Sequence, residues 1–510
     1  MNRRGFIQIS SVALLPILLG IFPKPSKDRG KYSIDVKSNR SFGHLLRSLS
    51  KTDPVSERSV DYVIVGGGVA GIAAATQLSG KSFVLFEADD RLGGSSASDH
   101  WKDTVFAMGA HYELAYPESF GKEVIDLLKR MNVIRFNDYS KLYEFVDEQY
   151  VIDKAQMEQC FLKGELIDDV LSDVEGGDKF EEILMAFKGK MLLPTRLIEE
   201  EYHYLNTISF KEFIESKMTL SDDLERRISY QMLDDWGGKC DEVSALAGIH
   251  YYMCRPYDEK DVPLFSPPNG NSYFIEKMVG YVDEPDAFEV NTLVRSIREV
   301  EDGVEIEVIT PAREVELIRA KKVIYAGQKH ALKYILRTEK PLFDNSYAPW
   351  LVLNFICRKG VDFDKWQNDV VTDNLEFLGF VNSRAQKTRS KDYDVFTAYY
   401  CLSELNREQL VKIEEEPADF VESTIDLIAD ETGTNLRDYL EHVNIKLMGH
   451  AMPIPKPGYL SFKDVPSHSS NIIFAGVDTG RLPLFYEACD SGIQAGKNLL
   501  EEIKNKNYEG

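Results

Sequence analysis

Cysteine is scarce in this chain of 510 residues, and no two cysteines have the spacing of a chemical pair. A C-x-x-C spacing, which would indicate a zinc site or a redox dithiol, does not occur. We therefore predict neither a metal site nor a dithiol centre. The six cysteines are Cys160, Cys240, Cys254, Cys357, Cys401 and Cys489.

The chain also lacks an excess of basic residues. It has 60 lysines and arginines against 83 aspartates and glutamates, which gives a formal net charge of -23. A nucleic-acid partner needs a cationic face that contacts phosphates, so we predict no nucleic-acid binding. An acidic surface suits a cationic substrate such as an amine, although net charge can also serve solubility alone. The length indicates two or more domains.

Long apolar runs are absent except at the N-terminus. Arg3-Arg4 precedes an apolar run from Ile9 to Phe22, a pattern that resembles a twin-arginine export signal. The run is short for a membrane-spanning helix, which needs about 20 residues. We predict a signal or anchor over residues 1–30 and a linker over 31–57. The protein is then periplasmic or envelope-anchored and associates with the membrane through its N-terminus. The alternative is that the two arginines precede a short membrane anchor by chance. The sequence leaves open whether the segment is cleaved from the mature protein.

After this segment the pattern is that of an α/β protein. A buried parallel strand is predicted over residues 60–65, a helix over 71–79 and a second strand over 82–87, which together form a βαβ unit. Residues 117–244 are charged and helical, and strand patterns return from 288. We predict a Rossmann-like dinucleotide-binding domain from 58–116, 245–345 and 455–505. It is interleaved with an α+β substrate domain from 117–244 and 346–454.

A glycine-rich loop joins the first predicted strand to its helix. In Gly66-x-Gly68-x-x-Gly71, the first glycine permits a tight turn and the second lets the backbone approach a pyrophosphate. Gly71 allows the helix to pack closely against the strand. The pyrophosphate would rest on the helix N-terminus, at Val69 and Ala70. Glu87 ends the next strand about 20 residues later, where a carboxylate binds ribose hydroxyls.

The residues that follow carry a family resemblance. Glu87-Ala88-Asp89-Asp90-Arg91-Leu92-Gly93-Gly94-Ser95 resembles the second FAD motif of the flavin-containing amine oxidoreductase superfamily, which includes monoamine oxidases and phytoene desaturases. The resemblance implies that Ala88, Arg91, Gly93, Gly94 and Ser95 lie against FAD rather than NAD. Many members have an arginine after the two glycines, whereas this chain has Ser95.

Two further segments resemble the same superfamily. The first is Phe474-Ala475-Gly476-Val477-Asp478-Thr479, followed by a helix that contains Ser491-Gly492-Ile493. The resemblance implies that Asp478 contacts the ribityl chain and that the helix points at the flavin. The second is Asn291-Thr292-Leu293-Val294, where Val294 would place its backbone against the adenine. No cysteine stands where the family attaches flavin covalently, so we predict non-covalent FAD.

The catalytic residues are predicted less directly. Many family members have a lysine near flavin N5, but the comparable region here is Ala348-Pro349-Trp350-Leu351. The aromatic residue expected before the last helix is also displaced, with Leu484 and Phe485 near its place. The candidates are His111, His450 and Tyr486. Either histidine can orient a substrate or move a proton, or can simply be packed, and Tyr486 can face the flavin or belong to the core.

Three functional hypotheses follow. The first is an FAD-dependent oxidoreductase that oxidises an amine, because flavin carries the hydride chemistry and the protein supplies orientation. The second is a desaturase or isomerase of the same fold that acts on an isoprenoid or another apolar substrate. The third is a flavin-binding partner protein without turnover. The substrate, the electron acceptor and the oligomeric state stay open.

Overall fold

The structure is a computed structural model that describes residues 32–38, 40–47, 52–114, 120–254, 264–386, 390–403, 406–463 and 466–508. The predicted export signal lies outside these residues. Across the described ranges, every helix is too short or too polar to span a bilayer.

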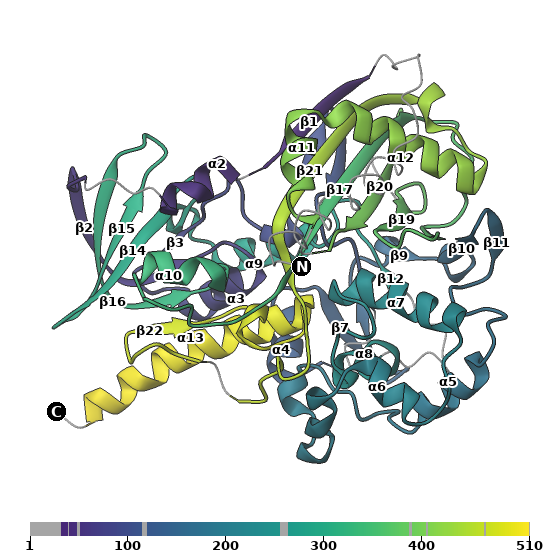
Figure 1. The fold of residues 1–510 in the computed structure, drawn as a ribbon. Coiled ribbons are helices and arrows are strands. Elements are labelled where there is room, and N and C mark those ends of the chain that lie inside the picture. Colours follow the sequence, from purple (N-terminus) through teal and green to yellow (C-terminus); the bar gives the residue numbers. More distant parts are fainter. Residues whose placement is uncertain are drawn as a thin grey trace, which may run out of the picture.

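The first lobe is built on a seven-stranded sheet, at the left of Figure 1. The predicted βαβ unit is present as β2, the helix α3 (Val69–Leu78) and β3, and β2 pairs with β3 and β16 in parallel. The strands, in spatial order, are β13 (Phe288–Glu289), β3 (Phe83–Phe86), β2 (Ser56–Val65), β16 (Val315–Tyr325), β15 (Gly303–Ile309) and β14 (Leu293–Val300), with β22 (Ile472–Phe474) paired to the end of β16.

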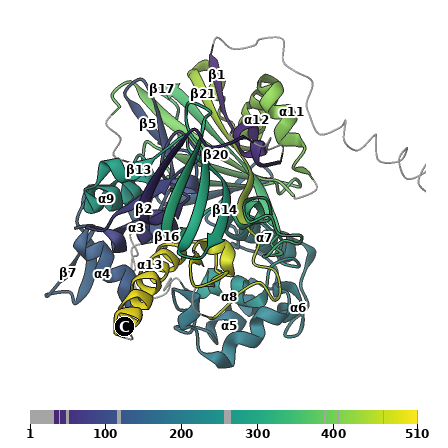
Figure 2. The same cartoon turned by 90° about the vertical axis from the view of Figure 1, so that its left-hand side faces the viewer.

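Helices cover one face of this sheet. The C-terminal helix α13 (Phe485–Tyr508) packs against α3 and α4 (Lys122–Arg130), and α9 (Ser272–Val282) also contacts α3. Figure 2 shows α13 and α4 on the same side of the lobe. The contact between α3 and α13 is close because Gly492 has no side chain: a Cβ there would lie 2.0 Å from the Ala70 carbonyl oxygen.

The second lobe contains an eight-stranded sheet, at the upper right of Figure 1. Helices α11 (Gln409–Glu415) and α12 (Pro417–Thr432) cover one of its faces through a shared apolar core. The strands, in spatial order, are β1 (Ser33–Lys37), β21 (Leu440–Pro453), β17 (Tyr347–Arg358), β20 (Tyr393–Cys401), β19 (Phe377–Asn382), β18 (Gln367–Val371), β10 (Glu158–Leu162) and β11 (Glu165–Ile167).

A block of helices completes the second lobe below this sheet (Figure 1). It consists of α5 (Gly177–Met185), α6 (Phe210–Glu215), α7 (Asp222–Trp236) and α8 (Ala245–Met253), which share one apolar cluster. Local sequence sets the ends: Ser209 and Glu212 form a capping box on α6, and Gly237 ends α7 in a left-handed conformation.

The remaining helices and strands are short. They are α2 (Arg40–Gly43), β4 (Ser98–Trp101), β5 (Thr104–Ala107), β6 (Glu113–Leu114), β7 (Ile134–Asn137), β8 (Leu142–Phe145), β9 (Val151–Ile152), β12 (Leu264–Phe265) and α10 (Leu332–Ile335).

The predicted α/β fold class is confirmed, and the structure places three of the predicted segments as follows. Within the range predicted as a linker, Ser33–Lys37 form β1, which pairs with β21, and β2 begins at Ser56. The segment 245–253 is α8, whose apolar face packs on α6 and α7 rather than on the first lobe. Helix α4, predicted within the substrate domain, buries Val124, Leu127 and Leu128 in the core of the first lobe.

Candidate functional site

A continuous cavity of about 1260 Å³ lies between the two lobes. It extends from the glycine-rich loop at Gly68 to aromatic walls at Trp350 and Tyr399 in the second lobe. Single small-molecule pockets enclose roughly 300–1,000 Å³. This volume is therefore enough for a large ligand together with a smaller one.

The glycine-rich loop combines two tightly packed glycines with one open position. Gly66 has φ 102°, and a Cβ on it would lie 2.8 Å from the Gly327 nitrogen. A Cβ on Gly71 would lie 1.9 Å from the Gly66 carbonyl oxygen. A Cβ on Gly68 would meet nothing within 4 Å. Gly66 and Gly71 are thus required by the fold, whereas Gly68 faces space that a ligand can use.

Glu87 closes this loop at the end of β3. Its carboxylate accepts the Gly67 N–H at 2.6 Å and the Asp89 N–H at 2.7 Å. Burial raises the pKa of the Glu87 carboxyl, while these two N–H groups oppose the rise. The same side chain lines the cavity, so it is in place to accept hydrogen bonds from hydroxyl groups.

The second glycine motif lies directly against the first. The Gly93 N–H donates to the Gly67 carbonyl at 2.7 Å, and a Cβ on Gly94 would lie 3.4 Å from the Gly68 Cα. Arg91 is turned elsewhere: it forms ion pairs with Asp90 at 2.7 Å and Asp99 at 2.9 Å. The Gly93-Gly94 backbone, and not the arginine, therefore forms this wall of the cavity.

The C-terminal motif is held by Ser491. Gly476 has φ 121°, and its N–H donates to the Ser491 hydroxyl at 3.0 Å. Gly492 contacts α3 as described above, and Ile493 is buried in the core beside it. Ser491, Gly492 and Ile493 thus position the loop rather than line the cavity.

Asp478 is the centre of a buried polar cluster that includes a lysine missed at the sequence level. Its carboxylate accepts the Lys329 N–H at 2.7 Å, the Lys329 Nζ at 2.9 Å and the Tyr347 hydroxyl at 3.0 Å. Burial lowers the pKa of Lys329, although Asp478 opposes this effect. Lys329 also donates to the Ala475 carbonyl at 2.6 Å, so it joins the loop after β16 to the C-terminal motif.

These features fit a flavin dinucleotide. Gly68 precedes α3, and no side chain caps this helix, so its first N–H groups and its dipole favour an anion. The open face of Gly68 and the adjacent Gly94 give the anion room. Glu87, Val294, Gly476 and Asp478 line the same cavity.

His111 is buried in the cavity wall and paired with Tyr399, a residue that the sequence analysis missed. The Tyr399 hydroxyl donates its single proton to the Gly109 carbonyl at 3.0 Å. The contact of 2.7 Å between this hydroxyl and His111 Nδ1 is then made by the Nδ1 proton. Burial lowers the pKa of His111 to about 4. A hydrogen bond with the Gln386 side chain opposes this lowering, but the imidazole is still neutral at pH 7.

His450 also lines the cavity but belongs to a different group of residues. Its ring stacks on His330 at a centroid distance of 3.9 Å and meets the edge of Tyr347 at 5.5 Å. Burial, and then the charges of His330 and Arg407, lower the pKa of His450 to about 3. His450 is thus close to Asp478 through Tyr347. His111, in contrast, pairs with Tyr399 on the sheet of the second lobe.

Tyr486 lies in the first turn of the last helix, at the cavity wall. It stacks on Phe120 with ring centroids 3.6 Å apart and is 3% exposed. Tyr486 is thus both a core tyrosine and a cavity residue. Its ring limits the space beside the C-terminal motif.

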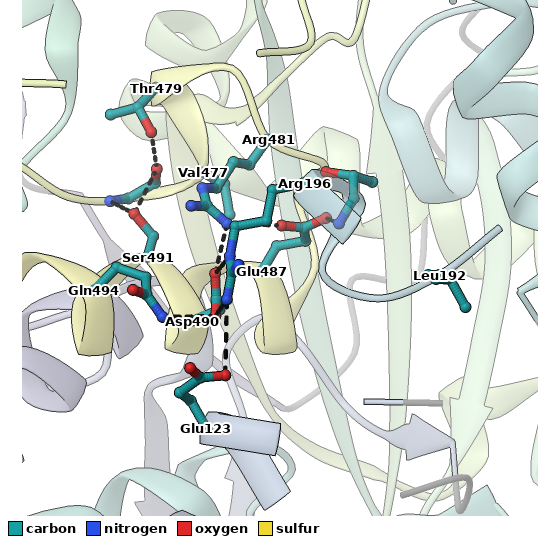
Figure 3. A network of polar contacts seen from close by, with 12 residues as sticks. Glu123, Leu192, Arg196, Val477, Thr479, Arg481, Glu487, Asp490, Ser491 and Gln494 are labelled. Carbon is teal, nitrogen blue, oxygen red and sulfur yellow. Dashed lines mark hydrogen bonds and ion pairs between the residues drawn. The ribbon is translucent and has the colours of Figure 1, made fainter. Parts of the chain in front are cut away.

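A buried ion-pair network lies behind the C-terminal motif (Figure 3). Asp490 accepts two hydrogen bonds from Arg196, at 2.8 and 2.9 Å, and one from Arg481 at 2.8 Å. Glu487 contacts Arg481 at 3.4 Å and accepts the Thr195 N–H at 2.6 Å. Burial opposes ionisation of Asp490, yet the two arginines hold its pKa below the ordinary value. A possible sequence signal was the spacing of Glu487 and Asp490, which places both on one helix face.

Two acidic residues at the end of α7 were also missed. Asp234 and Asp235 line the cavity together with Trp236 and Tyr251. Asp234 acts electrostatically on Tyr399, so it lies on the His111 side. Within the described residues, no group of three or more histidine, cysteine or acidic side chains could hold a metal ion.

The cavity brings together most of the predicted site residues. Gly71, Arg91, Ser491, Gly492 and Ile493 do not line it. Those that do are Gly66, Gly68, Val69, Ala70, Glu87, Ala88, Gly93, Gly94, Ser95, His111, Val294, His450, Gly476, Asp478 and Tyr486.

Comparison with known proteins agrees with this arrangement. A double mutant of putrescine oxidase matches with a TM-score of 0.64 at 13% identity, over 87% of this chain and 100% of that chain. Cyclohexylamine oxidase from Brevibacterium oxydans IH-35A matches with a TM-score of 0.60 at 14% sequence identity. The match covers 88% of this chain and 100% of that chain. A proposed protoporphyrinogen oxidase from Exiguobacterium sp. 255-15 matches with a TM-score of 0.59 at 14% sequence identity. The match covers 88% of this chain and 100% of that chain. At these identities the likeness shows a shared fold.

No curated protein matches the sequence. Residues 69–360, more than half of the chain, match the family described as flavin-containing amine oxidoreductases. This range includes the start of α3, the Gly93-Gly94 motif and His111. The chain therefore belongs to the flavin-containing amine oxidoreductase family and is a flavin oxidoreductase.

Proposed function

We propose that this flavin oxidoreductase binds FAD non-covalently and oxidises an amine. The observation that carries the proposal is one continuous cavity. It joins the glycine-rich loop at Gly68 to the wall formed by His111, Tyr399 and Asp234. When bound, flavin supplies the hydride acceptor. The chain supplies binding, orientation and exclusion of water.

FAD is favoured over a shorter flavin because the cavity has features for both ends of a dinucleotide. Glu87 and Val294 lie where an adenosine would be held, and the N-terminus of α3 suits the diphosphate. The six cysteines are free, and five of them are buried in the fold. These observations support non-covalent FAD.

A cationic amine is favoured by the acidic residues of the cavity. Asp234 and Asp235 attract a cation, and the aromatic rings of Trp236 and Tyr251 beside them suit an ammonium group as well. The neutral imidazole of His111 is too weak a base to deprotonate an ammonium ion. As a neutral side chain of the cavity wall, it can instead help to orient an amine that has already lost its proton.

Anaerobic mixing with a panel of amines tests the proposal. The absorbance of oxidised flavin is expected to bleach with at least one monoamine, diamine or polyamine. If no amine bleaches the flavin while an apolar isoprenoid does, the substrate is of the apolar class and the amine assignment is wrong. Membership of an oxidoreductase family makes a partner protein without turnover the weaker hypothesis.

The acidic pair gives a prediction about affinity. The Asp234→Asn, Asp235→Asn double variant is expected to raise the amine concentration for half-maximal flavin reduction about tenfold or more, because a charge-assisted contact contributes roughly 1.5–3 kcal/mol. The limiting reduction rate should change less. Stopped-flow reduction over a range of amine concentrations measures both quantities. An unchanged half-maximal concentration would exclude a role for this pair in binding.

His111 gives a prediction about rate. Replacing it by phenylalanine keeps a planar ring but removes the contact of Nδ1 with the Tyr399 hydroxyl and the hydrogen bond with the Gln386 side chain. We expect flavin reduction at saturating amine to slow by about 10- to 100-fold, since small losses of orientation cost this much. FAD content should stay the same. His100→Phe is the control, because that side chain is 75% exposed, and a similar rate loss there would remove His111 from the site.

We further propose that the chain is exported in folded form, on the sequence evidence of Arg3-Arg4 and the apolar run after them. Changing both arginines to lysine is expected to keep the flavoprotein in the cytoplasm, because the export machinery reads the arginine pair. Cell fractionation measures this. An envelope location that both variant and wild type share would contradict the proposal.

A further inference from the structure

An N-terminal arm, defined here as residues 32–47 without residue 39, bounds the cavity from outside the family-matched range, which begins at residue 69. Its strand β1 pairs in parallel with β21, with Ser33 opposite His442 and Lys37 opposite Lys446. Its helix α2 and the following 3-10 turn, His44–Arg47, then reach the first lobe (Figure 1). The arm therefore crosses from one lobe to the other.

Side chains fix the arm at both ends of this crossing. Arg40 forms an ion pair of 2.8 Å with Glu414, which lies on α11 in the second lobe. The guanidinium of Arg313 lies 4.4 Å above the ring of Phe42, and Leu46 packs on the apolar cluster of the first lobe. That cluster includes Val294, a cavity residue. The arm therefore borders the cavity, which it lines through Ser38, Arg40, Gly43, His44, Leu46 and Arg47.

Four basic side chains line the cavity, and they differ in their partners. Lys446 is paired with Asp89 at 3.0 Å and Arg40 with Glu414. Arg407 donates to the carbonyl oxygens of Gly449 and Tyr347 at 2.7 and 3.0 Å. Arg47 forms no ion pair with an acidic side chain in the described part of the chain. It is therefore the lining cation whose charge is available to a ligand.

Arg47 and the glycine-rich loop line the same cavity. Gly66 packs against Gly327, and the next residue, Gln328, donates from Nε2 to the His450 carbonyl at 2.5 Å. The charge of Arg47 acts on both His330 and His450. One short loop, 327–330, thus links the glycine-rich loop to the two histidines on which the charge of Arg47 acts.

The two glycine motifs themselves bring no unpaired basic side chain to the cavity. Ser95 follows the two glycines, and Arg91 is committed to Asp90 and Asp99. Lys329 is buried against Asp478. A diphosphate bound there would have the N–H groups of α3 on one side and would lack a charged partner from its own motif.

We propose that the N-terminal arm is part of the cofactor site and that Arg47 supplies positive charge to the diphosphate of FAD. This inference rests on the proposed binding of FAD. It assigns a binding role to a segment outside the family match, and it makes the arm a strap that joins the lobes when the cofactor is bound.

The test measures the dissociation constant of FAD for the full-length protein after its flavin has been removed, by titration of FAD fluorescence. Arg47→Gln is expected to weaken FAD binding about 10- to 100-fold, as for a lost hydrogen bond to a charged group. Arg47→Lys should restore part of the affinity. Because the effect is electrostatic, added salt should weaken FAD binding less in Arg47→Gln than in the wild type.

Arg298→Gln is the matched control, because it removes the same charge from a side chain that is 71% exposed and pairs with Glu305. It should bind FAD as the wild type does. The inference is overturned if Arg47→Gln binds FAD as tightly as the wild type, or if the two variants lose the same affinity. A wild-type protein that does not bind FAD at all would instead refute the proposed function, and the inference with it.

Discussion

The Gly68→Val variant is expected to fold like the wild type and to be isolated without flavin. Gly68 has φ -76°, which valine adopts readily, and a Cβ at this position meets no protein atom within 4 Å. The added side chain would instead fill the space in front of the N-terminus of α3, where the anion is expected to bind. The ratio of flavin to protein absorbance and the circular dichroism spectrum measure the two outcomes.

Gly71→Val is the matched variant and should behave in the opposite way. Valine is the better helix former by a few tenths of a kcal/mol, so helix propensity alone predicts a small gain in stability. The Cβ would lie 1.9 Å from the Gly66 carbonyl oxygen, and this clash far outweighs the gain. We expect insoluble or unfolded protein. Equal flavin loss from two folded variants would contradict the different roles of Gly68 and Gly71.

Local sequence predicted the parts of the site in which the backbone is the functional group. The positions of Gly66, Gly68 and Gly71 follow from spacing, because a strand, a tight turn and a helix are consecutive in the chain. Glu87 was predicted for the same reason, since it ends the next strand of the same βαβ unit. In the structure Gly66 and Gly71 pack within the turn, whereas Gly68 and Glu87 line the cavity.

The side chains that meet across the fold had no comparable signal. Lys329 and Asp478 are far apart in sequence, and only the parallel pairing of β16 with β22 brings the loops after them together. Tyr399 reaches His111 because β20 lies in the sheet of the other lobe. The arm was predicted as a linker because its polar composition does not reveal that β1 pairs with β21.

The second large effect is expected at Asp490, whose buried carboxylate binds the guanidinium groups of Arg196 and Arg481. Its side chain is 0% exposed, and Arg481 beside it is 3% exposed. Asp490→Asn keeps the shape but leaves Arg196 and Arg481 without the shared carboxylate. Breaking a buried ion pair by removing one partner costs about 3–5 kcal/mol. We therefore expect a clear fall in the melting temperature of the flavin-free protein.

The same variant should also weaken flavin binding, because the next residue, Ser491, holds the Gly476 N–H at the cavity. The pKa of Asp490 lies below its ordinary value, so the carboxylate contributes its full stabilisation above about pH 4 and loses it as the pH falls further. The melting temperatures of variant and wild type should therefore differ most at neutral pH. Asp373→Asn is the control: Asp373 pairs with Arg226 at 3.1 Å but is 85% exposed, so solvent screening leaves it little effect. If both variants melt at the wild-type temperature, the buried network does not stabilise the fold around the C-terminal motif.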